Sequence, residues 1–158
     1  MSISLILADD HPLTREGMKA YLAKEADFNI LGSYADGESA WAGILQLKPQ
    51  VALLDIRMPG IDGVALARKI KDASLPVASL MLTSYDAQQY VMASLRAGAR
   101  GYVLKTASMD TLSKAIRIVA RGGFYLDSEV ANAVEQEGDF VPEPVSVRER
   151  EVLLLAAR

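Results

Sequence analysis

Cysteine is absent from the 158 residues of this sequence, and histidine occurs once. The lack of cysteine excludes disulfide bonds, thiolate metal sites and thiol nucleophiles. The chemistry of any functional site therefore has to come from carboxylates, hydroxyl groups, lysine and a single imidazole.

The sequence also lacks a basic excess and a long apolar run. It has 17 Lys and Arg against 20 Asp and Glu, a net charge of -3, and 6% aromatic residues. This balance provides no overall basic field for non-specific nucleic-acid binding, so any DNA contact requires a local patch. No run approaches the roughly 18 apolar residues of a membrane span, and ISLILA has no basic flank to make it a signal peptide. We therefore expect a soluble, cytoplasmic protein with no membrane partner.

Five short apolar runs alternate with segments that carry helical signals. Near-continuous apolar character bounded by turn residues is typical of strands buried on both faces, as in a parallel sheet. The predicted strands are ISLILA (3–8), FNILGSY (28–34), VALLD (51–55), VASLMLT (77–83) and GYVLK (101–105). The predicted helices are 12–25, 36–47, 62–73, 86–97 and 108–121. This alternation predicts an α/β fold with a doubly wound, five-stranded parallel sheet and right-handed crossovers.

The pattern divides the chain into three parts. Residues 1–122 form the α/β domain, 123–144 a short helix and an acidic linker with prolines, and 145–158 (VSVREREVLLLAAR) a further helical segment. In a doubly wound sheet, ligands bind outside the carboxyl ends of the strands. The residues that follow each apolar run are therefore the candidate site.

Polar residues follow four of the five predicted strands. These are Asp9-Asp10, Asp55, Thr83-Ser84 and Lys105, and all of them are expected at one edge of the sheet. Three carboxylates within a few Å repel one another, and one ammonium does not balance them. A divalent cation does, and oxygen ligands suit Mg²⁺ or Mn²⁺ with a phosphoryl oxygen completing its shell. The cluster thus favours an acyl phosphate on Asp55, with Lys105 and the Thr83 hydroxyl on the phosphoryl oxygens.

Each of these residues has a simpler reading on its own. Asp55 is also a turn residue, Asp9-Asp10 also a helix N-terminus, Thr83 also a strand former and Lys105 also a solvated charge. His11 is a metal candidate by residue type, but a histidine beside a helix start also forms local hydrogen bonds. The joint order on strands one, three, four and five is the specific signal.

Four segments, LILADDHP, LLDIRMPGIDG, MLTSYD and GYVLK, resemble the signature segments of bacterial response-regulator receiver domains, most of all those of the NarL/FixJ subfamily. The resemblance covers residues 3–126 and implies the receiver (CheY-like, flavodoxin-like) fold. It further implies a two-component system in which a sensor histidine kinase phosphorylates Asp55. Such a domain catalyses only its own phosphorylation and dephosphorylation, and is otherwise not an enzyme.

The same resemblance assigns roles to the other residues. Asp9 and Asp10 form an acidic metal pocket, with Asp10 as the direct ligand, and the backbone carbonyl of Arg57 completes the protein ligands. Thr83 and Tyr102 match the hydroxyl and aromatic switch positions. The surface formed by 86–97, strand five and 108–121 is then expected to dimerise, or to dock a partner, on phosphorylation.

Two departures from the family pattern affect these expectations. Many receivers have proline after the lysine, whereas Thr106 follows Lys105 here, and both isomers of that peptide bond stay open. Arg57 and Tyr85, two residues after Asp55 and Thr83, are bulky and flank the approach of water in this family. We therefore expect slow self-dephosphorylation.

Residues 146–158 (SVREREVLLLAAR) resemble the opening of a LuxR-type helix-turn-helix domain, of which only the first helix is present. Because such a domain reads DNA with its second helix, we expect DNA binding and transcription control only through the missing remainder. Two other functions compete with this interpretation. An aspartate-nucleophile phosphatase of the haloacid-dehalogenase type needs its nucleophile on the first strand and an acid where Arg57 stands. An atypical receiver would act through protein contacts without phosphorylation.

Overall fold

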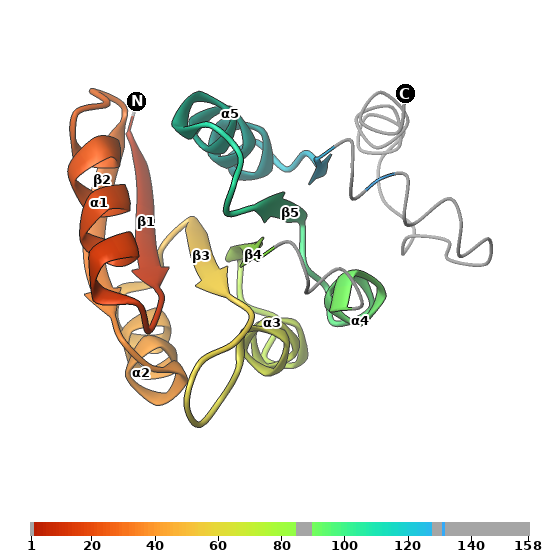
Figure 1. Cartoon of the computed structure of the whole chain (residues 1–158). Helices are drawn as coiled ribbons and strands as arrows, with labels where there is room; N and C mark the ends of the chain where they lie inside the picture. Colours follow the sequence, from red (N-terminus) through yellow and green to blue (C-terminus); the bar gives the residue numbers. More distant parts are fainter. Residues whose placement is uncertain (1, 85–89, 128–130, 132–158) are drawn as a thin grey trace.

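The computed structural model describes residues 2–84, 90–127 and 131, and within them a parallel sheet lies between two layers of helices (Figure 1). The strands run in the order β2-β1-β3-β4-β5-β6, and every neighbouring pair is parallel. Their bounds are β1 (Ile3–Ala8), β2 (Phe28–Tyr34), β3 (Val51–Asp55), β4 (Ala78–Thr83), β5 (Gly101–Leu104) and β6 (Tyr125–Leu126). The predicted doubly wound α/β fold is confirmed.

Residues that favour a helix start precede or open α1, α2, α3 and α5. Their bounds are α1 (Pro12–Ala23), α2 (Gly37–Leu47), α3 (Gly63–Asp72), α4 (Val91–Arg96) and α5 (Met109–Ala120). Pro12 takes the first position of α1, where its missing N–H is not needed. The side chains of Asp36, Asp62 and Ser108 each accept a hydrogen bond from a backbone N–H in the first turn of their helix. Residues 86–89 of the predicted helix 86–97 lie outside the described residues.

Two apolar cores, one on each face of the sheet, set the register of the strands. Leu53 packs with α1 and α5, and its neighbour Leu54 packs with α2, α3 and α4. Figure 1 shows the same division of the helices between the two faces. Because successive strand residues point to opposite faces, a slip by one residue would exchange the two cores. Asp55, the last residue of β3, is thereby fixed at the carboxyl edge.

A sixth strand, β6, is added to the five that the sequence predicts. The backbone N–H of Tyr125 donates to the carbonyl of Arg100, and that of Asp127 to the carbonyl of Tyr102. The sheet therefore includes residues beyond 122, and the helix predicted to follow Gly123 does not begin at once. The segments predicted as a linker and as a terminal helix-turn-helix fragment fall outside the described residues. Within the described part, no helix is long and apolar enough to cross a membrane.

Gly63, the first residue of α3, provides a test of how tightly α3 packs on the site strand. A Cβ at Gly63 would clash with the backbone carbonyl of Asp55, and it would lie 2.9 Å from Cε of Met81. We expect Gly63→Ala to lower the free energy of unfolding by about 1 to 3 kcal/mol, because α3 must move away from β3. Urea denaturation measures the change.

Gly17→Ala is the matched control. Gly17 lies inside α1, and nothing is found within 4 Å of a Cβ added there. This substitution is expected to raise the free energy of unfolding by about 0.5 to 1 kcal/mol, since alanine is the better helix former. Equal effects of the two substitutions would contradict the close packing of α3 on β3.

Candidate functional site

Asp55 and Lys105 meet at the carboxyl edge of the sheet, as the sequence predicts. Asp55 ends β3 and is 4% exposed, and Lys105 directly follows β5. The Lys105 ammonium lies 3.0 Å from Oδ2 of Asp55 and 3.2 Å from Oδ2 of Asp9. One ammonium thus bridges two carboxylates, one at the end of β3 and one directly after β1.

Asp9, Asp10 and His11 form the turn between β1 and α1. The backbone N–H of His11 donates to Oδ1 of Asp9 over 2.8 Å. Its ring Nδ1 lies 3.0 Å from Oδ1 of Asp9, 3.2 Å from Oδ1 of Asp10 and 3.7 Å from Oδ2 of Asp55. One ligand atom from each of these four residues lies within 4.8 Å of the others. His11 therefore makes the local hydrogen bond weighed in the sequence analysis and also belongs to the cluster.

The pKa values of the two most buried carboxyl groups shift in opposite directions. Burial raises the pKa of Asp55 above its ordinary value, and it outweighs the hydrogen bond from Lys105. Burial also opposes ionisation of Asp9, but the hydrogen bond from the His11 backbone and the charge of Lys105 together lower its pKa. Lys105 is itself partly buried, yet the hydrogen bond and charge of Asp55 and the charge of Asp9 raise its pKa. Asp9 and Lys105 thus form a charged pair. Ionisation of the buried Asp55 beside them costs free energy.

The donor set of the cluster fits a divalent cation. Asp9, Asp10 and Asp55 make three carboxylate pairs with oxygen atoms within 4.8 Å of each other, and at that separation two like charges repel by about 3.5 kcal/mol at an effective dielectric near 20. Oδ2 of Asp9 and Oδ1 of Asp10 are buried, and each has a nitrogen 3.2 Å away, from Lys105 and His11 respectively, without the geometry of a hydrogen bond. Crowded carboxylate oxygens with hydrogen-bonding capacity to spare suit a hard cation such as Mg²⁺ or Mn²⁺, which prefers oxygen ligands.

The two switch candidates, Thr83 and Tyr102, are in contact inside the protein. Thr83, at the end of β4, is 1% exposed, and its hydroxyl donates to the carbonyl of Ser84 over 3.1 Å. The ring of Tyr102, on β5, is 0% exposed and lies in the core on the α2, α3 and α4 face. Burial raises the Tyr102 pKa to about 12, against a smaller opposite effect of its hydrogen bond to Thr83. The side chain of Tyr102 is therefore fully buried, in contact with Thr83.

The loop between β3 and α3 carries Arg57 and ends at the cap of α3. Gly60 has φ +75°, a conformation that glycine adopts without strain, and it turns the chain after Pro59. The Asp62 side chain accepts a hydrogen bond from the N–H of Ala65 over 2.8 Å. The N-cap of α3 therefore coincides with the first residue of the predicted helix 62–73. Tyr85 lies outside the described residues.

Arg57 makes a contact that the sequence analysis missed. Its guanidinium lies over the ring of Tyr90, 5.8 Å from the ring centroid. No spacing or residue pattern pairs a loop after strand three with the residue before α4, so the sequence carries no signal for this contact. The peptide bonds of the described residues are trans, and this settles the isomer left open at Lys105-Thr106.

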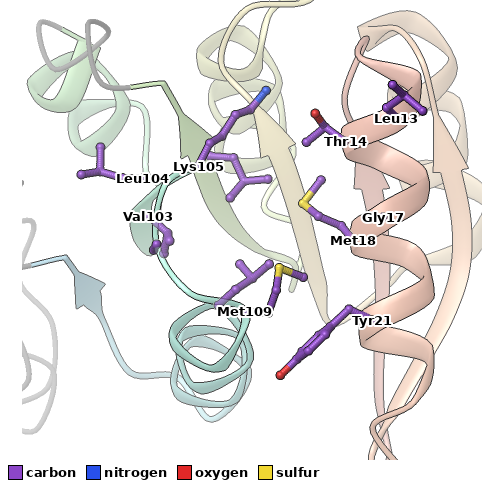
Figure 2. Close-up of a pocket in the computed structure, with 12 residues that line it drawn as sticks. Leu13, Thr14, Gly17, Met18, Tyr21, Val103, Leu104, Lys105 and Met109 are labelled. Atoms are coloured by element: carbon purple, nitrogen blue, oxygen red, sulfur yellow. The ribbon is translucent and has the colours of Figure 1, made fainter.

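The pocket over the carboxylates has a volume of about 490 Å³. Its lining comprises Asp10, His11, Thr14, Asp55, Ile56, Arg57, Thr83, Ser84 and Lys105. A second pocket, of about 380 Å³ and mostly apolar, opens between α1 and α5 and shares Thr14 and Lys105 with the first. Figure 2 shows Met18 and Tyr21 of α1 facing Met109 at the start of α5 across this second pocket. The polar pocket and the apolar pocket are therefore neighbours, with Lys105 between them.

The fold and the site define a class: a flavodoxin-like α/β domain with an acidic pocket and a lysine at the carboxyl edge of its sheet. The response regulator receiver domain family matches residues 5–117, and the chain belongs to this family.

Individual relatives agree with this assignment. The chain is 37% identical over 135 residues to the transcriptional regulatory protein DegU of Brevibacillus brevis, covering 85% of this chain and 57% of that protein. It is 34% identical over 162 residues to the response regulator protein VraR of Staphylococcus aureus strain Mu3, covering 100% of this chain and 77% of that protein. The structure of a DNA-binding response regulator of the LuxR family from Staphylococcus aureus has a TM-score of 0.72 at 30% identity, and covers 75% of this chain and 98% of that one. The predicted resemblance is therefore confirmed.

The raised pKa of Asp55 predicts how stability depends on pH. Because the folded state holds the proton more tightly than the unfolded chain, stability falls as the pH rises from the ordinary value of 3.8 through the raised pKa. Asp55→Asn does not ionise, so without metal it should be more stable than the wild type at pH 7. This advantage should shrink as the pH is lowered toward 4. Urea denaturation at both pH values measures it.

Asp72→Asn serves as the control, because Asp72 is exposed at the end of α3. Its free energy of unfolding should stay within about 0.5 kcal/mol of the wild type at both pH values. An Asp55→Asn protein that is less stable than the wild type at pH 7 would show that the charge of Asp55 is not costly in the fold.

Proposed function

We propose that this chain is the phosphoacceptor of a two-component system, in which a sensor histidine kinase transfers a phosphoryl group to Asp55. The observation that carries the proposal is the Asp55 carboxylate, which lies in the 490 Å³ pocket with Lys105 at 3.0 Å and with Asp9 and Asp10 beside it. Membership of the receiver family supports it. The two relatives named above are regulatory proteins, which supports transcription control as the output.

In the proposed reaction, a carboxylate oxygen of Asp55 attacks the phosphorus of a phosphohistidine. The new P–O bond forms as the P–N bond breaks, and the imidazole leaves and takes up a proton from solvent. The Lys105 ammonium, already paired with Asp55, stabilises charge on the phosphoryl oxygens. The Thr83 hydroxyl would exchange its hydrogen bond to the Ser84 carbonyl for one to a phosphoryl oxygen.

A divalent cation, Mg²⁺ or Mn²⁺, would be held by Asp9, Asp10, Asp55 and the backbone carbonyl of Arg57. When bound, it supplies the positive charge that three carboxylates and one ammonium lack. The protein's own contribution is to hold these oxygens together at the buried edge of the sheet.

The kinase would approach over the mouth of the site. The apolar pocket between α1 and α5 shares Thr14 and Lys105 with that mouth, and Leu13 beside it is 91% exposed. A helix of the kinase resting there would place its phosphohistidine at Asp55. Phosphorylation would then shift Thr83 and Tyr102 and promote homodimerisation through the surface of α4, β5 and α5. Location in the cytoplasm and DNA binding through a LuxR-type domain complete this proposal.

Labelling by a small acyl phosphate in the presence of Mg²⁺ tests the proposal. Intact mass should show one added phosphoryl group on the wild type and none on Asp55→Asn, because the nucleophilic oxygen is lost. Asp72→Asn should be labelled like the wild type. Label that persists on Asp55→Asn would refute the assignment. An unlabelled wild type would favour the alternative of an atypical receiver that acts through protein contacts alone.

Thermal unfolding tests the cation site separately. A ligand that binds only the folded state stabilises it, by about 2.7 kcal/mol at 100 times its Kd. Mg²⁺ should therefore raise the Tm of the wild type and of Asp72→Asn, but have little effect on Asp10→Asn. An equal rise in all three proteins would mean that the ion binds elsewhere.

A further inference from the structure

The contact between Arg57 and Tyr90 joins two parts of the chain that are far apart in the sequence. The guanidinium of Arg57 is exposed, and it lies 5.8 Å from the Tyr90 ring centroid, within the range of a cation–π contact. Tyr90 immediately precedes α4 and packs against the core shared by α2, α3 and α4. The contact therefore links the loop after the site strand to the start of α4.

The same guanidinium belongs to a residue that lines the pocket of Asp55. The part of that lining that the structure describes contains two basic side chains, Arg57 and Lys105. Lys105 already pairs with Asp9 and Asp55. Arg57, in contrast, contacts the neutral ring of Tyr90 and not a carboxylate of the cluster. It is the group that new negative charge in the pocket would attract.

A phosphoryl group on Asp55 is a stronger partner for Arg57 than a tyrosine ring. It carries about -1.5 to -2 charge and three acceptor oxygens. The planar guanidinium matches phosphate oxygens with paired hydrogen bonds, and such charge-assisted bonds are roughly twice as strong as neutral ones. A cation–π contact at an exposed position shifts an equilibrium by only about two- to fivefold.

We propose that Tyr90 and the phosphoryl group on Asp55 compete for the side chain of Arg57. This inference rests on the proposed function and adds a positioning residue to it. Before phosphorylation, Tyr90 holds the guanidinium at the side of the pocket. Afterwards, the guanidinium moves onto the phosphoryl oxygens and covers the phosphorus, and the Tyr90 ring is released.

The competition controls the lifetime of the phosphoryl group. In hydrolysis, a water oxygen attacks the phosphorus, the bond from phosphorus to the Asp55 oxygen breaks, and inorganic phosphate leaves with the Asp55 carboxylate restored. Arg57 over the phosphoryl group obstructs that in-line approach. Tyr90, by drawing Arg57 away, shortens the lifetime, although Tyr90 itself does not touch the reacting atoms.

The test follows loss of the phosphoryl group from the full chain, labelled with an acyl phosphate and Mg²⁺ and then freed of donor. Tyr90→Leu removes the ring and keeps an apolar contact with the core, so the phosphoryl group should persist about two- to fivefold longer. Tyr90→Phe keeps the ring and should behave like the wild type. Tyr90→Met also removes the ring, with an apolar side chain of a different shape, and should have the same effect as Tyr90→Leu. Arg57→Gln should lose the phosphoryl group at least twofold faster.

The decisive comparison is Tyr90→Leu in the Arg57→Gln background, where it should have no effect on the lifetime. A Tyr90→Leu effect of equal size in both backgrounds, or a shortened lifetime in Tyr90→Leu alone, would overturn the competition. The Kd of beryllium fluoride, a phosphoryl mimic, gives the same test without hydrolysis and should fall two- to fivefold in Tyr90→Leu only when Arg57 is present. Absence of label on Asp55 would instead refute the proposed function, and the competition with it.

Discussion

The crowding of three carboxylates around one ammonium is the constraint on which the rest of the site depends. Lys105 pairs with Asp9 and Asp55, and this leaves the cluster with an excess of negative charge. Burial raises the pKa of Asp55, and the nearby charge of Asp9 adds to the rise. This excess of negative charge favours the binding of a cation at the cluster. In the proposed function, the metal offsets this negative excess, and Arg57 moves to offset the further negative charge that the phosphoryl group adds.

The fold holds these carboxylates together by burying the strand residues that precede them. Leu53 and Leu54 anchor β3 in two different cores, so Asp55 cannot retreat from the edge without disturbing both. Gly63 lets α3 pack against the carbonyl of Asp55 from the other side. Apolar burial over the whole sheet exceeds the repulsion among a few carboxylates, and this is why the strained site is compatible with a stable domain.

The sequence predicted the strands and the site residues for the same physical reason. In a parallel sheet, the carboxyl ends of buried strands meet at one edge, so the order of Asp9, Asp55, Thr83 and Lys105 after apolar runs was sufficient to bring them together. Strand β6 escaped prediction because two residues, Tyr125 and Leu126, have no periodicity, and their pairing depends on a neighbour already in place. The contact of Arg57 with Tyr90 escaped because it depends on side-chain conformation and on where α4 begins, neither of which the apolar pattern encodes.

Under the proposed function, the phosphoryl group would act on the β4 to α4 region from two sides. Thr83 ends β4 and touches the buried Tyr102 of β5, whereas Tyr90 precedes α4 and touches the exposed Arg57. The first contact is protected from water, so any change at Thr83 has to be accommodated by repacking of the core around Tyr102. The second is at the surface, so Arg57 can change partners at little cost in packing. The buried contact of Thr83 with Tyr102 and the exposed contact of Arg57 with Tyr90 would thus both act on α4 and β5. When both contacts change together, the response to phosphorylation would be a switch between two states.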